Sequence, residues 1–104
     1  MNEAALTGKA KRRADQAVIG AYHEAKLAEL LDHVREAFGE YDAGRLDAFE
    51  LDKVIHQYHR AAQEIWKFCV VSGTQLVIAV RTLEWWRTEG EEPDWWEVAA
   101  PSRK

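Results

Sequence analysis

The sequence is poor in residues that break helices and in residues that cross-link small folds. It contains two prolines and six glycines in 104 residues, which argues against many short strands and favours long helices. Its single cysteine, Cys69, excludes a disulfide within the chain. We therefore expect a buried thiol in a reducing compartment.

Long apolar runs are also missing. No stretch approaches the roughly 18 residues of a membrane span, and the first residues have no apolar signal-peptide core. These absences predict no membrane contact and a cytoplasmic location. The formal net charge of −4 argues against a general nucleic-acid binder. A short basic cluster is interpreted as a solvated helix end, with a nucleic-acid tag as the weaker alternative; it consists of Lys9, Lys11, Arg12 and Arg13.

The chain is 47% hydrophobic and 31% charged, which suits one domain with a modest core. We expect a flexible N-terminus at residues 1–10, a single helical domain at residues 11–98, and a flexible C-terminus at residues 99–104. The familiar motifs of nucleotide binding, hydrolysis and zinc catalysis are absent from the sequence. We accordingly predict no catalytic residue, no cofactor and no metal site.

The stretch from Leu46 to Val71 has the strongest helical pattern. Asp47 and Glu50 have the spacing of a capping box, which marks the start of a helix. Apolar residues then recur at alternating intervals of three and four, which predicts one broad apolar face. Cys69 lies on that face, in line with a buried thiol.

A first helix is predicted from about Lys11 to Phe38, with Gly39 just beyond its end and the turn to the next helix at residues 39–45. It carries two apolar rows. Large residues form one row (Leu27, Leu31, Val34 and Phe38), and small residues form the other (Ala14, Ala17, Ala21, Ala25 and Ala28). We expect the alanine row to face Tyr58, Trp66 and Phe68 across an antiparallel hairpin, because small residues opposite large ones pack well.

A third helix is predicted after Ser72, which has the spacing of a second capping box with Gln75, and it should end before Gly90. Asp94 and Glu97 could cap a further short turn after Pro93. The fold class predicted is therefore all-α: a long antiparallel hairpin, a third helix that completes a three-helix bundle, and a short C-terminal helical turn.

Five tryptophans are many for so short a chain. Adjacent helical residues diverge by about 100°, so Trp85 and Trp86 cannot both face one core. Tryptophan is enriched at binding hot spots. The leading hypothesis is a non-catalytic interaction module that self-associates as a dimer or binds a protein partner. The surface assigned to that partner comprises Val77, Ile78, Trp85, Trp95 and Trp96. An equal alternative is that Trp95 and Trp96 fold back and cap the end of the bundle.

The alternative is a small enzyme or metal-binding protein. His56 and His59 are the densest polar group, and the hairpin would bring His23 or Glu24 near them, where an imidazole and a carboxylate could exchange protons near neutral pH. Two further carboxylate–imidazole pairs, Glu29 with His33 and Asp52 with His56, are predicted to point outward as surface pairs.

The segment from residue 42 to residue 69, D-A-G-R-L-D-A-F-E-L-D-K-V-I-H-Q-Y-H-R-A-A-Q-E-I-W-K-F-C, together with the later P-D-W-W-E, resembles small helical proteins of high-GC actinobacteria. The resemblance covers roughly residues 41–96. It implies a bacterial, cytoplasmic origin and carries no activity, cofactor or partner with it.

Overall fold

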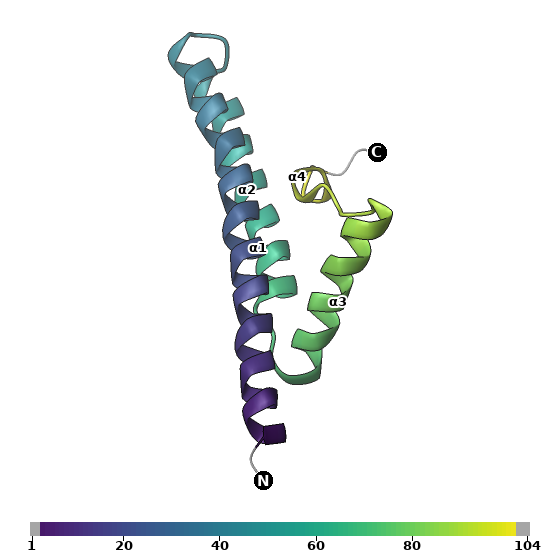
Figure 1. Ribbon diagram of the computed structural model, residues 1–104. Coiled ribbons are helices and arrows are strands. Elements are labelled where there is room, and N and C mark those ends of the chain that lie inside the picture. The colour runs from purple at the N-terminus through teal and green to yellow at the C-terminus, as the bar shows by residue number, and fades with distance from the viewer. Residues whose placement is uncertain (1–2, 102–104) are drawn as a thin grey trace.

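The computed structural model describes residues 3–101, and the side chains of residues 8–101. Its regular structure over that range is entirely helical, as the sequence predicts (Figure 1). The four helices are α1 (Glu3–Asp42), α2 (Ala48–Cys69), α3 (Gly73–Glu89) and α4 (Trp95–Val98).

The first two helices form the antiparallel hairpin. The turn between them contains Gly44 at φ 79°, a left-handed conformation that favours glycine over residues with a side chain. Arg45 fixes the turn with two hydrogen bonds from its guanidinium to the Glu40 carboxylate, at 2.7 and 2.8 Å. Gly39 is not the end of α1, because the helix runs on to Asp42.

Helix α1 is much longer than its partner. It begins at Glu3 rather than near Lys11, so residues 3–10 are helical. At 1.5 Å per residue its 40 residues span about 60 Å, whereas the 22 residues of α2 span about 33 Å. The start of α1 therefore extends beyond the end of α2 (Figure 1).

The caps explain where the other helices begin and end. The Asp47–Glu50 capping box is present, with hydrogen bonds of 2.9 and 2.8 Å in the two directions. Helix α3 begins after Ser72 as predicted, but the Ser72 side chain makes no cap hydrogen bond. The prediction of a second capping box is therefore wrong. Gly90, at φ 70°, ends α3 in the left-handed conformation.

The alanine row of α1 does not face α2, and this prediction is wrong. All five alanines are exposed. The residues of α1 that turn inward are Ile19, Leu30 and Ala37, with Tyr22 and Leu27 partly buried beside them. Burial of Ile19, Leu30, Tyr22 and Leu27 removes more apolar area from water than burial of the alanine row would. Trp66, expected opposite the alanines, is 57% exposed.

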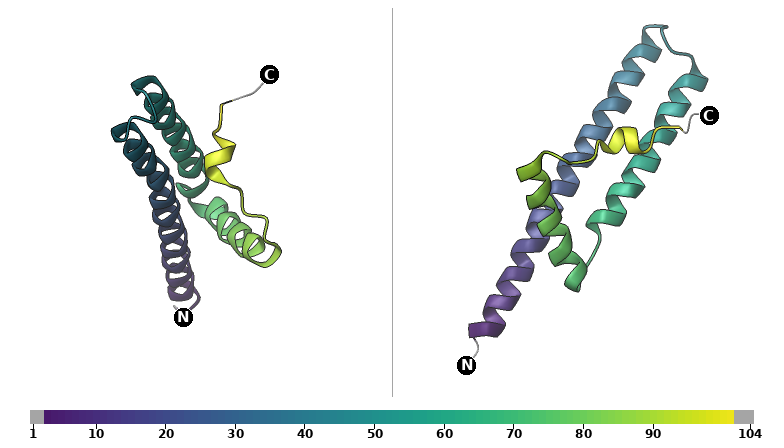
Figure 2. Two further views of the ribbon diagram at one scale, coloured as in Figure 1. Left: turned by 90° about the horizontal axis from the view of Figure 1, so that it is seen from above. Right: turned by 90° about the vertical axis from the view of Figure 1, so that its right-hand side faces the viewer.

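Helices α3 and α4 lie on the same side of the hairpin (Figures 1 and 2). Helix α3 crosses α1 obliquely, and α4 then returns across the hairpin toward α2 (Figure 2). The core lies between the hairpin and these two helices, where Ala61 and Ile65 of α2 are fully buried against Leu76 and Ala79 of α3.

The molecule is elongated for its mass. It measures 66 × 28 × 20 Å, and its radius of gyration is 17.8 Å, against about 13 Å for a compact chain of this length. Its accessible surface is 7697 Å², whereas a compact monomer of 12.0 kDa exposes about 6000 Å². The excess is thus about 1700 Å². Within residues 3–101, none of the helices combines the length and apolar character needed to cross a bilayer.

Candidate functional site

The outer side of α3 carries two large apolar residues that the fold leaves uncovered. Ile78 is 50% exposed and Trp85 is 53% exposed. They are seven residues apart, which places them one above the other on the same side of the helix. They lie opposite Leu76 and Val80, which α3 buries in the core. We call Ile78 and Trp85 the α3 stripe. Val77, the third residue assigned to this surface, is only partly exposed at its edge.

Trp86 turns the other way and enters an aromatic cluster. Its ring centroid lies 5.1 Å from that of Phe68 on α2 and 6.2 Å from that of Trp95. Tyr22 completes the cluster from α1, with its ring centroid 6.0 Å from that of Phe68. The divergence of Trp85 and Trp86 therefore follows the helical geometry predicted from sequence, with one residue in the interior and one outside.

A short polar chain crosses this cluster. The indole nitrogen of Trp95 donates to the Tyr22 hydroxyl at 2.7 Å. That hydroxyl donates to Glu92 Oε2 at 2.6 Å. Lys26 Nζ lies 2.8 Å from the same oxygen and 5.5 Å from the centroid of the Tyr22 ring. Three elements are thus joined: α1, α4 and the segment between α3 and α4.

Burial and neighbouring charges shift the pKa values of Tyr22, Glu92 and Lys26. Burial raises the pKa of Tyr22, and the neighbouring Glu92 carboxylate raises it further. Burial alone would raise the pKa of Glu92, but hydrogen bonds from Lys26 and Tyr22 outweigh it and leave that pKa below its ordinary value. Burial would lower the pKa of Lys26, but its contacts with Glu92 and Glu29 outweigh it and leave that pKa raised. At neutral pH the three groups are a phenol, a carboxylate and an ammonium.

Trp95 and Trp96 are packed against the molecule's own hairpin, so the structure favours the capping alternative for both. The Trp96 ring stacks on His33 of α1, with centroids 4.2 Å apart and planes 2° apart. Gln57 of α2 donates to the Trp96 carbonyl oxygen at 2.9 Å, and Arg60 donates to the Ala99 carbonyl oxygen at 3.2 Å. The segment from Glu92 to Ala99, which we call the C-terminal clasp, therefore binds both helices of the hairpin.

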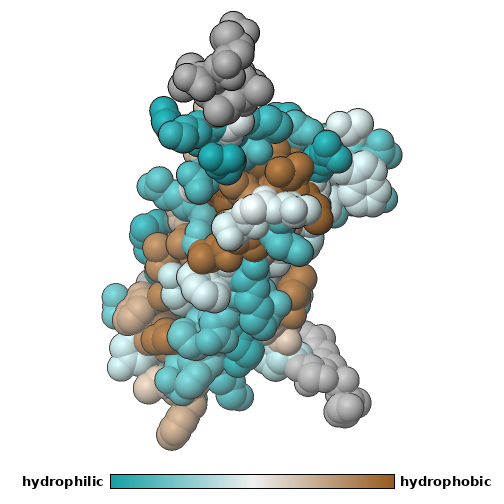
Figure 3. Space-filling view, turned by 90° about the horizontal axis from the view of Figure 1, so that it is seen from below, coloured by the Kyte–Doolittle hydropathy of each residue, from teal (hydrophilic) through white to brown (hydrophobic). Residues whose placement is uncertain are grey.

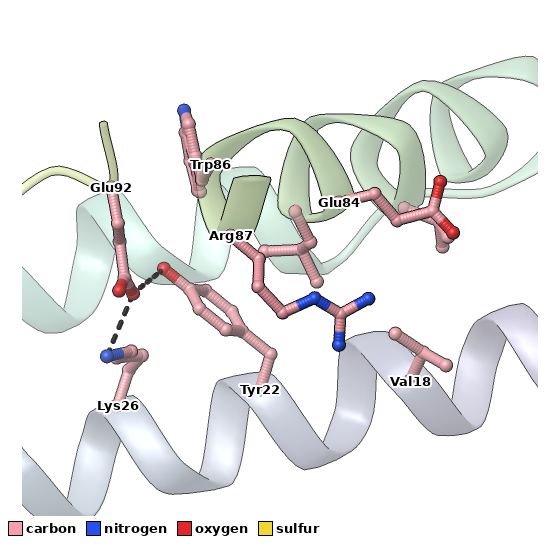
Figure 4. A pocket seen from close by; sticks show the side chains of 9 residues that line it. Val18, Tyr22, Lys26, Glu84, Trp86, Arg87 and Glu92 are labelled. Atoms are coloured by element: carbon pink, nitrogen blue, oxygen red, sulfur yellow. Dashed lines mark hydrogen bonds and ion pairs between the residues drawn. The ribbon is translucent and has the colours of Figure 1, made fainter. Parts of the chain in front are cut away.

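A cavity of about 470 Å³ opens between α1 and α3 beside the aromatic cluster (Figure 4). Tyr22 and Trp86 border it, Arg87 reaches across it toward Val18, and Lys26 closes one end (Figure 4). Its volume falls within the range of small-molecule sites. Since Lys26 is already ion-paired with Glu92, the cavity offers an apolar wall and one further cation, Arg87.

The structure spreads out the polar residues of the alternative site. His56 and His59 are exposed on α2, and Glu24 is exposed on α1, while His23 is partly buried. His56 pairs with Asp52 at 3.3 Å, so that pair lies on the surface as predicted. Glu29 pairs with Lys26, whereas His33 stacks on Trp96 instead of pointing freely outward. Nowhere in residues 8–101 do three or more His, Cys, Asp or Glu side chains gather in a way that could hold a metal ion.

Sequence reasoning missed a second apolar surface, on the side of the hairpin away from α3 and α4. Leu31 lies nine residues from Tyr22, which is half a turn around α1. Trp66 lies two residues from Phe68, which is about 160° around α2. Because Tyr22 and Phe68 face the aromatic cluster, Leu31 and Trp66 face away from it. The same surface includes the exposed Phe38 of α1 and Ile55 of α2, with Leu27, Val34 and Ala62 partly buried along its border, and we call the whole set the open hairpin face.

No protein-family model, curated protein or solved structure matches this chain. The surfaces and contacts described above are therefore the observations that bear on function. Among these, the α3 stripe and the open hairpin face are apolar areas that the fold leaves in contact with solvent, whereas the C-terminal clasp and the aromatic cluster are engaged in holding the fold together.

Proposed function

We infer that this chain is a non-catalytic helical interaction module, which self-associates or binds a protein partner through a tryptophan-bearing surface. The observation that carries this proposal is the α3 stripe: Trp85 is 53% exposed near the C-terminal end of α3, with Ile78 two turns before it on the same side of the helix. Half-exposed tryptophan on a fixed backbone is typical of a binding hot spot, because it buries a large area at little cost in conformational entropy.

The clasp supports the proposal indirectly. It anchors the segment that follows α3 to both helices of the hairpin, so that the three longer helices act as one bundle and α3 presents its outer side in a constant orientation. A preorganised surface loses less entropy on binding than a mobile one. Trp95 and Trp96, which the sequence pattern assigns to the partner surface, have this supporting role in the proposal. We place the module in the cytoplasm of a bacterium, as the sequence resemblance implies.

The test is native mass spectrometry of the protein purified gently from its own host. We expect a homodimer or a complex with a second protein chain, and we expect Trp85→Ala to lose the chain bound at the α3 stripe while circular dichroism shows unchanged helix content. Phe49→Ala is the control, because Phe49 is 81% exposed at the hairpin turn and outside the α3 stripe. A chain that stays bound at the α3 stripe of Trp85→Ala would overturn the proposal, as would a monomer that carries a small molecule.

A further inference from the structure

The open hairpin face has the spacing of a helix-bundle seam. On α1 its residues are Leu27, Leu31, Val34 and Phe38, separated by four, three and four positions. On α2 the residues Ile55, Ala62 and Trp66, with His59 between the first two, repeat the same intervals of four, three and four. Such intervals keep a straight stripe along a helix and are characteristic of the core positions of coiled coils and four-helix bundles.

Within residues 3–101, much of this face is in contact with solvent, while Leu27 and Ala62 at its border also pack against the core. Leu31 is 44% exposed, Phe38 45% and Ile55 40%. Both α3 and α4 lie on the other side of the hairpin (Figures 1 and 2). Figure 3 views the molecule from below rather than onto this face, and shows apolar residues reaching the surface in several places there as well. Two side-by-side stripes of bundle spacing therefore form one half of a four-helix arrangement.

The chain exposes enough surface beyond that of a compact monomer to supply a dimer interface. The excess over a compact monomer, about 1700 Å², is about twice the roughly 800 Å² that each partner buries in an interface of standard size. The open hairpin face mixes the smaller Val34 and Ala62 with the larger Phe38 and Trp66. A face that mixes small and large residues in this way can pack against itself.

The charges select the relative direction of the two copies. Residues 9–15, at the start of α1, contain four basic residues and one acidic residue. Residues 35–53, around the hairpin turn, contain six acidic and three basic residues. In an antiparallel pair the acidic turn of one copy approaches the basic start of α1 in the other. In a parallel pair like charges would meet, which is unfavourable.

We propose that two copies of this chain form an antiparallel four-helix bundle by packing their open hairpin faces together. The basic cluster from Lys9 to Arg13 then meets the acidic turn of the second copy. This inference goes beyond the proposed function, because it assigns a different surface from the α3 stripe and names a second copy of the chain as its occupant. The α3 stripes remain on the outside of the dimer, free for another protein.

Sedimentation equilibrium of the purified chain tests the proposal. We expect the wild type to have twice the monomer mass of 12.0 kDa at micromolar concentration. Leu31→Glu should weaken the dimer at least about 100-fold, because it buries an unpaired charge in each half of the interface. Helix content should not change, since Leu31 is exposed in the single chain. Ala21→Glu, on the exposed back of α1, is the matched control and should leave the dimer intact.

The orientation has its own measurement. Spin labels on Ala10→Cys, in a Cys69→Ala background, should lie more than about 50 Å apart in the antiparallel dimer and within roughly 20 Å in a parallel one, given the rise per helical residue. A monomeric wild type, a dimer indifferent to Leu31→Glu, or the short distance would each overturn the proposal. The α3 stripe is tested separately: a dimer that dissociates with Leu31→Glu and persists with Trp85→Ala supports this inference whatever the α3 stripe binds.

Discussion

The indole nitrogen of Trp95 donates a hydrogen bond to the hydroxyl of Tyr22 at 2.7 Å, across 73 positions of sequence. The same hydroxyl donates to Glu92, so one oxygen atom joins α1 to two points of the C-terminal clasp. Few groups in this molecule connect segments so far apart in the chain, and the consequences of removing it can be measured.

Replacement of Tyr22 by phenylalanine should lower the free energy of unfolding by about 1–2 kcal/mol, because it leaves the Trp95 indole without its acceptor and removes one of the two donors to Glu92. Urea denaturation followed by circular dichroism measures the change. Tyr41→Phe is the matched control, since Tyr41 is exposed near the end of α1. Equal losses in the two variants would contradict the role assigned to the Tyr22 hydroxyl.

Acidification should weaken the clasp through Glu92. Its pKa in the folded protein is below the ordinary value of 4.5, so the carboxylate stabilises the fold above that value and the contribution disappears as the pH falls through the lowered pKa. We expect the wild type to be more stable than Glu92→Gln at pH 7 and the difference to narrow below about pH 4.5. Thermal unfolding of both proteins between pH 7 and pH 3 measures it, and a constant difference would refute the prediction.

Removal of the N-cap side chain should destabilise the protein more at the start of α2 than at the start of α3. Asp47→Ala removes an observed capping hydrogen bond and should cost about 1 kcal/mol. Ser72→Ala removes a side chain that makes no cap hydrogen bond and should change stability by less than about 0.5 kcal/mol. Chemical denaturation of the two variants side by side decides the matter, and a larger loss for Ser72→Ala would show that the serine does cap α3.

The thiol of Cys69 should be inert in the folded protein. The side chain is 6% exposed, and burial raises its pKa to about 11, so at pH 8 only about one thiol in a thousand is the reactive thiolate. We expect slow reaction with an aromatic disulfide reagent until urea unfolds the chain. Ala17→Cys, which places a thiol on the exposed side of α1, should react at once; similarly rapid labelling of Cys69 in wild type would contradict its burial.

Local features of the fold could be predicted from sequence because they depend on neighbouring residues. The capping box of α2 uses residues three apart, and Gly90 ends α3 through its own backbone conformation. The turn after Pro93 follows from Asp94, whose side chain accepts from the amides of Trp96 and Glu97. Each of these elements has nearly the same energy whatever the rest of the chain does.

The orientation of α1 could not be predicted in that way. Apolar residues lie on more than one side of this helix, so its own periodicity does not select the side that is buried. Contacts from distant segments select it: Phe68 and Trp95 meet Tyr22, and Trp96 meets His33. The two candidate surfaces differ in the same way. The divergence of Trp85 from Trp86 is set by local helix geometry and could be predicted. The exposure of Leu31 and Trp66 depends on where α3 and α4 lie and could not.

The clasp also has a consequence for the order of folding. The hairpin closes around a short turn between Asp42 and Ala48, so its contacts can form while the rest of the chain is still unstructured. The bond between Tyr22 and Trp95 closes a loop of 73 residues, and closure of long loops is slower and entropically costlier. We expect the hairpin to form early in refolding and the clasp to engage last. In the native state the clasp should then be the first part to open, so its amides should exchange with deuterium before those at the centre of α2.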